Sequence, residues 1–123
     1  MASSKQHGKM DDILKSMQSH IGVVGVIIID SKSRSIIKTT MEDQNMARKY
    51  ATLSLNVMES TAKAVGEDLE GEGGDVQILR IKMKRNEVMI APDGDFILVV
   101  IQNSDDAGFG STLHGASETS SSF

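Results

Sequence analysis

The sequence predicts an α+β domain in which two helices pack against a five-stranded, mostly antiparallel sheet. Residues 78–102 read as three consecutive strands, 78–84, 87–91 and 96–101. Asp93-Gly94 lies between the last two apolar runs and is a strong signal for a β hairpin. Upstream, residues 43–68 repeat apolar side chains with helical periodicity. The sequence therefore predicts a long helix between two β hairpin units, preceded by a short N-terminal helix.

Composition restricts both the architecture and the partners. A chain of 123 residues holds one small domain, and the absence of cysteine excludes a disulfide framework and thiolate metal sites. A net charge of -4, one Tyr, three Phe and no Trp disfavour a stacking surface for nucleic acid. The longest apolar run, 23–29, is far below the roughly 20 residues that span a bilayer. We expect no nucleic-acid partner, no membrane insertion and, without a signal-peptide pattern, a cytoplasmic protein.

Both ends of the chain are polar and rich in small residues. We expect residues 1–9 to be a disordered N-terminal tail and residues 104–123 a disordered Ser/Gly-rich tail, around a domain at 10–103. The C-terminal tail has few large apolar residues, which are Phe109, Leu113 and Phe123. Such a segment is open to phosphorylation or to partner binding.

The first predicted helix is short and amphipathic. It starts at Asp11 or Asp12, which suit the positive end of a helix, and stops at Gly22. Its apolar stripe is Ile13, Leu14, Met17 and Ile21. His20 lies near its end without a second His, Cys or acidic cluster, so we expect a structural or surface role.

The first hairpin pairs a buried strand with a shorter one. Residues 23–29 form an unbroken apolar run, in which Gly25 indicates a close approach of backbone or of a helix. A polar reversal at 31–35 leads to the partner strand at 36–40.

The long helix carries an apolar arc wider than one sheet covers. One stripe is Met46, Tyr50, Leu53, Val57, Thr61 and Ala64, and an adjacent stripe is Ala47, Ala51, Leu55, Met58, Ala62, Val65 and Leu69. A helix on a sheet needs only a stripe a little over about 100° wide, so a second element must cover the rest. The same helix of a second copy would do so, since most soluble oligomers are symmetric homodimers. The alternative is that the first helix covers this face within one chain.

The sequence predicts no metal, no cofactor and no catalytic site. Asp68, Glu70 and Glu72 alternate as in a calcium loop, but the twelfth position is Leu79 where an EF-hand needs a bidentate Glu. Residues 71–74 lack the Lys-Ser/Thr that a phosphate loop requires. No triad, carboxylate pair or ligand cluster emerges, so we expect a protein that is not an enzyme.

Several stretches resemble the roadblock family of dynein light chains. They are Gly22-Val-Val-Gly-Val-Ile-Ile-Ile-Asp30, Ile37-Lys-Thr-Thr40, Leu79-Arg-Ile81, Asn86-Glu-Val-Met-Ile-Ala-Pro-Asp93 and Ile97-Leu-Val-Val-Ile-Gln-Asn103. The match covers about residues 11–103. The resemblance implies a roadblock-like homodimer, in which the long helices pair and the strand after that helix joins its copy in one continuous sheet.

Two overlapping residue sets are the predicted interaction sites. The candidate dimer interface is Met46, Tyr50, Leu53, Ser54, Val57, Thr61, Ile78, Arg80 and Lys82. The candidate partner-binding set is the exposed basic group with its neighbouring methionine, namely Arg80, Lys82, Met83, Lys84 and Arg85. These charges could equally keep a bare sheet edge from pairing.

The resemblance implies a non-catalytic light chain of a dynein motor. Its dimer would bind the dynein intermediate chain, in the cytoplasm and associated with the cytoskeleton or with a ciliary or flagellar axoneme. By holding two copies of a disordered segment, such a dimer supports motor assembly and cargo attachment through avidity. The alternative is a roadblock-type scaffold or regulator of a small GTPase, because that wider superfamily uses the same dimer.

Overall fold

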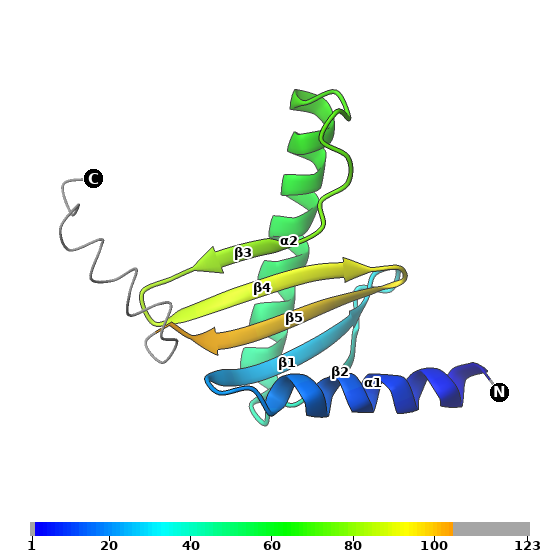
Figure 1. Ribbon diagram of the computed structural model, residues 1–123, viewed down its shortest axis with the longest axis vertical. Coiled ribbons are helices and arrows are strands. Elements are labelled where there is room, and N and C mark those ends of the chain that lie inside the picture. The colour runs from blue at the N-terminus through cyan, green and yellow to red at the C-terminus, as the bar shows by residue number, and fades with distance from the viewer. Residues whose placement is uncertain (1, 105–123) are drawn as a thin grey trace.

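The structure, a computed structural model, describes residues 2–104, which form two helices and one sheet (Figure 1). The elements in chain order are α1 (Ala2–Gln18), β1 (Val23–Asp30), β2 (Ile36–Thr39), α2 (Gln44–Asp68), β3 (Leu79–Lys82), β4 (Asn86–Asp93) and β5 (Phe96–Asn103). The predicted α+β class is confirmed, as is the long helix between a first hairpin and the three C-terminal strands. Apart from Ser104, the predicted C-terminal tail at 104–123 lies outside the described residues and stays a prediction.

The five strands form one antiparallel sheet in the order β2-β1-β5-β4-β3. β5 lies in the middle, as its unbroken apolar run predicts, and both Val99 and Val100 are buried because helices cover opposite faces of the sheet. The β4–β5 hairpin pairs Asp93 with Phe96, so its linking residues are Gly94 and Asp95. Gly94 has φ +62°, the conformation that the glycine in this turn was expected to supply.

The two helices pack on opposite faces of the sheet. On one face, α2 residues pack against Ile27 and Ile29 of β1 and against alternate residues of β4 and β5. On the other face, Met10 and Leu14 of α1 pack against Val26 of β1 and its neighbours. α1 therefore does not cover the exposed face of α2, and the alternative in which it does so is wrong.

Helix α1 is longer than the sequence predicted. It begins at Ala2 and continues through the segment expected to be a disordered tail, and it ends at Gln18. Met10 and Leu14 are one turn apart and both bury against the sheet, and the Asp11 carboxylate pairs with the Lys38 ammonium at 2.6 Å. These contacts fix the middle of a helix where the sequence indicated its start, so Asp11 is not a cap.

Strand β1 is shaped by residues at both of its ends. A Cβ atom at Gly25 would lie 2.5 Å from the Cγ atom of Met41, so the predicted close approach exists, with a side chain as the approaching group. At the other end, the Oδ1 atom of Asp30 accepts backbone N–H bonds from Lys32 and Ser33 at 2.8 and 3.1 Å. These two bonds lower the pKa of the Asp30 carboxyl and close the turn into β2.

Helix α2 begins as the sequence predicts. Asp43 is its N-cap, and the Asp43 carboxylate accepts the backbone N–H groups of Asn45 and Met46. The residues that α2 buries against the sheet are Ala47, Ala51, Ser54, Leu55 and Met58. Apart from Ser54, these belong to the second of the two predicted stripes, so that stripe faces the sheet.

Candidate interaction surface

The first part of the surface is the flank of α2, defined as Met46, Tyr50, Leu53, Val57 and Thr61. Met46 is 37% exposed, and the other four are partly buried in the single chain. The exposed remainder has no cover among the residues that the structure describes, because α1 lies on the other side of the sheet. This flank is therefore an apolar surface that a partner can bury.

Ser54 does not belong to this flank, so its assignment to the dimer interface is wrong. It has no exposed surface, and its hydroxyl donates to the carbonyl oxygen of Tyr50 one turn earlier at 2.7 Å. On a helical projection Ser54 falls at the boundary between the two stripes, and the sheet covers it.

The second part is the open edge of β3. The backbone N–H of Met83 donates to the carbonyl of Asn86 at 2.8 Å, which makes this a hydrogen-bonded pair of the β3–β4 ladder. Because such pairs alternate in antiparallel strands, Leu79 and Ile81 also bond to β4. The N–H and C=O groups of Arg80 and Lys82 then point away from β4, toward the open edge, where a further strand can pair with them.

Helix α2 continues past this edge. In Figure 1 its C-terminal half extends beyond β3, and the chain returns through an acidic loop to the strand. Ile78, predicted to start the strand, lies just before it and is 54% exposed. The open edge, the end of α2 and Ile78 therefore form one side of the molecule, with both apolar and backbone groups free to contact a second copy.

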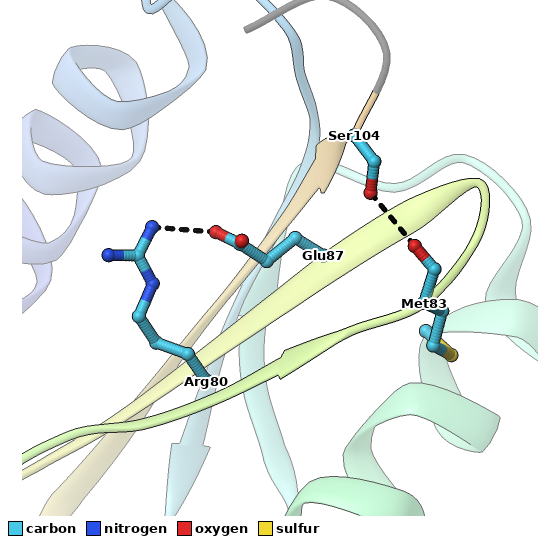
Figure 2. Close-up of polar contacts among 4 residues, drawn as sticks. All are labelled: Arg80, Met83, Glu87 and Ser104. Atoms are coloured by element: carbon cyan, nitrogen blue, oxygen red, sulfur yellow. Dashed lines mark hydrogen bonds and ion pairs between the residues drawn. The ribbon is translucent and has the colours of Figure 1, made fainter. Parts of the chain in front are cut away.

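The third part is basic and lies where β3 turns into β4. Lys82, Lys84 and Arg85 are exposed, and none of them forms an ion pair with another residue that the structure describes. Arg80 differs, because its guanidinium pairs with the Glu87 carboxylate at 2.6 Å (Figure 2). The predicted partner-binding set is thus brought together at one corner, but part of the charge of Arg80 is already neutralised.

The same corner holds the end of β5. The hydroxyl of Ser104 donates to the carbonyl oxygen of Met83 at 3.1 Å (Figure 2), and the Ser104 N–H donates to the Arg85 carbonyl at 3.0 Å. Met83 itself is 39% exposed. Ser104, the last described residue, is therefore held beside the cations by these two hydrogen bonds.

One exposed apolar pair was missed by the sequence reasoning. Ile21 is 94% exposed and Val24 is 46% exposed, at the start of β1. Ile21 was placed on the apolar stripe of the first helix, which is wrong because that helix ends at Gln18. The Gly22 that follows, with φ +88°, belongs to the turn into β1. No feature of the sequence alone distinguishes Ile21 from a core residue.

The chemistry of this surface is that of binding. Its side chains are apolar or cationic, and no group of three or more His, Cys, Asp or Glu capable of holding a metal gathers among the described residues. Within residues 2–104, neither helix is both long and apolar enough to cross a bilayer.

Comparisons with known proteins concern the family and the fold of the chain. The model of the Roadblock/LC7 domain family matches residues 9–103 of the chain. Among solved structures, the Roadblock/LC7 domain from Streptomyces avermitilis is similar, with 15% identity and a TM-score of 0.63 over 84% of this chain and 88% of that chain. Myxococcus xanthus MglB is similar with 16% identity and a TM-score of 0.57 over 74% of this chain and 67% of that chain. At such identities the structural likeness concerns the fold.

Proposed function

The chain belongs to the Roadblock/LC7 domain family, and we propose that it acts as a non-catalytic homodimeric scaffold that holds a protein partner. The observation that carries this proposal is the side of the molecule where the open β3 edge, the C-terminal end of α2 and Ile78 lie together, with the apolar flank on the same helix (Figure 1). Each of these features alone is common on protein surfaces. Together they offer backbone hydrogen bonds and apolar area to the same second molecule.

A second copy of the chain is the simplest molecule that can both pair with the backbone of the β3 edge and bury the apolar area. Antiparallel pairing of β3 with its copy would fill the open hydrogen bonds of Arg80 and Lys82, and would remove the edge that otherwise invites aggregation. The same two-fold operation would bring the two α2 flanks together, since an isologous interface uses the same patch on both subunits. The ends of α2 that extend past β3 would then lie over the partner subunit.

The basic corner supports a partner that supplies acidic residues. Lys82, Lys84 and Arg85 are free to meet carboxylates, and Met83 adds a flexible apolar contact beside them. A disordered segment of the dynein intermediate chain fits this description if it folds there as an amphipathic helix with acidic residues. With that partner, the protein would be a dynein light chain in the cytoplasm, associated with the cytoskeleton or an axoneme.

A small GTPase is at least as well supported as the partner. The stretch that most resembles dynein light chains, Asn86–Asp93, is β4, and its Val88 and Ile90 are fully buried. A resemblance carried by buried residues reports the core of the family more than the choice of partner. Neither the family match nor the similar folds name the intermediate chain, so we propose both partners for the same corner.

Binding by the purified full-length chain distinguishes them. The probes are synthetic peptides covering the intermediate chain and a panel of small GTPases, each loaded with GDP or with a GTP analogue, measured by titration calorimetry. Saturable binding of one class, lost on changing Lys84 and Arg85 to Glu but kept on changing Lys49 to Glu on the exposed face of α2, would identify the partner class. Binding of neither class, by a chain shown to be a folded dimer, would overturn the proposed partners.

A further inference from the structure

We infer that the start of the C-terminal tail, residues 105–109, docks on the end of the sheet where β1 begins and β5 ends. This end patch is defined as Ile21, Val24, Lys84 and Arg85. The tail itself lies outside the described residues, and the inference rests on what the described residues leave exposed around Ser104.

The apolar half of the end patch is Ile21 with Val24. The register between β1 and β5 shifts between Val23 and Gly25. Val24 is therefore the extra residue of a β-bulge and has no partner residue on β5. Ile21 follows the end of α1 and is 94% exposed. Two exposed β-branched side chains three residues apart, at the end of the sheet where β5 ends, offer apolar surface to one more apolar group.

The cationic half lies on the other side of β5. The Asn103 N–H donates to the Gly22 carbonyl at 2.8 Å, and the Ser104 N–H donates to the Arg85 carbonyl at 3.0 Å. The last residues of β5 are thus held between the turn before β1 and the β3–β4 turn. Lys84 and Arg85, in the latter turn, have no ion pair within residues 2–104.

The first residues of the tail have the complementary chemistry. The sequence after Ser104 is Asp105-Asp106-Ala-Gly-Phe109. These five residues reach at most about 16–18 Å when extended, while adjacent strands are only about 4.8 Å apart. The two carboxylates therefore fall within reach of Lys84 and Arg85, and the ring of Phe109 falls within reach of Ile21 and Val24.

A weak contact is sufficient for docking, because residues 105–109 are covalently joined to the domain at Ser104. A short flexible linker gives an effective concentration on the order of millimolar, so a contact too weak to join separate molecules is still populated within one chain. The composition of 110–123 predicts no fold of its own, and the inference needs none. Lys84 and Arg85 also belong to the proposed partner surface, so a docked tail would compete with an acidic partner. This competition rests on the proposed function, whereas the docking itself does not.

A single fluorescent reporter tests the docking. The chain contains no tryptophan, so Phe109→Trp introduces one indole at the predicted contact. Its emission should be blue-shifted relative to a synthetic peptide of residues 104–123 with the same substitution. Ile21→Ser in the Phe109→Trp chain should return the emission to that of the free peptide. Leu69→Ser, which changes a 52% exposed leucine at the end of α2, is the matched control and should leave the shift in place.

The charges are tested in the same assay. Reversing Lys84 and Arg85 to Glu, or raising the salt concentration, should move the emission toward that of the free peptide. An emission in the Phe109→Trp chain equal to that of the peptide would overturn the inference, as would a shift that survives Ile21→Ser or the reversed charges. None of these outcomes depends on dimer formation or on a partner, so failure of the docking is separable from failure of the proposed function.

Discussion

The phenol oxygen of Tyr50 and the side-chain amide of Asn86 form a hydrogen bond, with 2.9 Å between the two atoms. This bond joins the flank of α2 to the first residue of β4, beside the turn that carries the basic corner. It is partly buried, so each group would lose its partner in a place with little water.

Tyr50→Phe should therefore lower the free energy of unfolding by about 1 kcal/mol, the usual net worth of such a bond. Chemical denaturation of Tyr50→Phe, Asn86→Ala and the double variant measures the coupling. The two single effects should not add, since each substitution removes the same bond. Strict additivity would show that the pair contributes nothing.

Gly25→Ala should destabilise the domain through overpacking against Met41. The added Cβ atom would meet the Cγ atom of Met41 at 2.5 Å, and a methionine can move at moderate cost. We expect a loss of about 1 kcal/mol, at the low end for added methylenes in a packed core. Met41→Ala should cost less in the Gly25→Ala chain than in the parent, because in the former it also relieves the overpacking. Equal costs of Met41→Ala in the two chains, measured by chemical denaturation, would place the strain elsewhere.

Leu53→Asp and Val57→Asp should weaken the proposed dimer, because each places an unpaired carboxylate in the flank of α2 that a second copy would bury. Burial of an unpaired charge costs several kcal/mol or drives its protonation. Sedimentation equilibrium should show dissociation at micromolar concentration, while circular dichroism shows retained helix and strand. Asn56→Asp, on the exposed face of α2, is the control and should keep the parent mass.

The fold followed from the sequence wherever one local pattern decided the structure. The apolar run of β5 predicts a central strand, Asp43 predicts the start of α2, and Gly94 predicts the tight hairpin. In each case neighbouring residues supply the whole signal. The early start of α1 did not follow, because the residues before Asp11 read as a polar tail, and only the packing of Met10 on the sheet fixes the helix there.

The candidate site was predicted in outline and missed in its details. A helical projection separates the two stripes of α2 but cannot decide that the sheet covers Ser54. Arg80 lies opposite Met89 in the β3–β4 register, so Glu87 is its diagonal neighbour and pairs with it. That ion pair is a consequence of register, as the exposure of Ile21 is a consequence of where α1 ends. Neither is present in the periodicity of the sequence.

Reversing Lys84 and Arg85 to Glu should slow association with an acidic partner and flatten its dependence on salt. Rim charges act mainly on the association rate, which falls with ionic strength. Both residues lie in the turn after β3, so the dimer should persist. Stopped-flow association is best measured in chains that end at Ser104, where no tail competes. Equal association rates for parent and variant, at both low and high salt, would show that these cations serve solubility and do not contact the partner.

Pairing of two copies along β3 is measured most directly by the distance between their edges. The chain has no cysteine, so Lys82→Cys and Ser35→Cys each accept one spin label, at the β3 edge and beside β2 at the opposite edge. Paired β3 strands would lie about 4.8 Å apart, and each residue of offset separates the two labelled positions by about 3.4 Å along the strand direction. Double electron-electron resonance should therefore give a short distance for the label at 82 and none comparable for the label at 35. A mass of 13.3 kDa, or a dimer whose labels at 82 show no short distance, would contradict the proposed assembly.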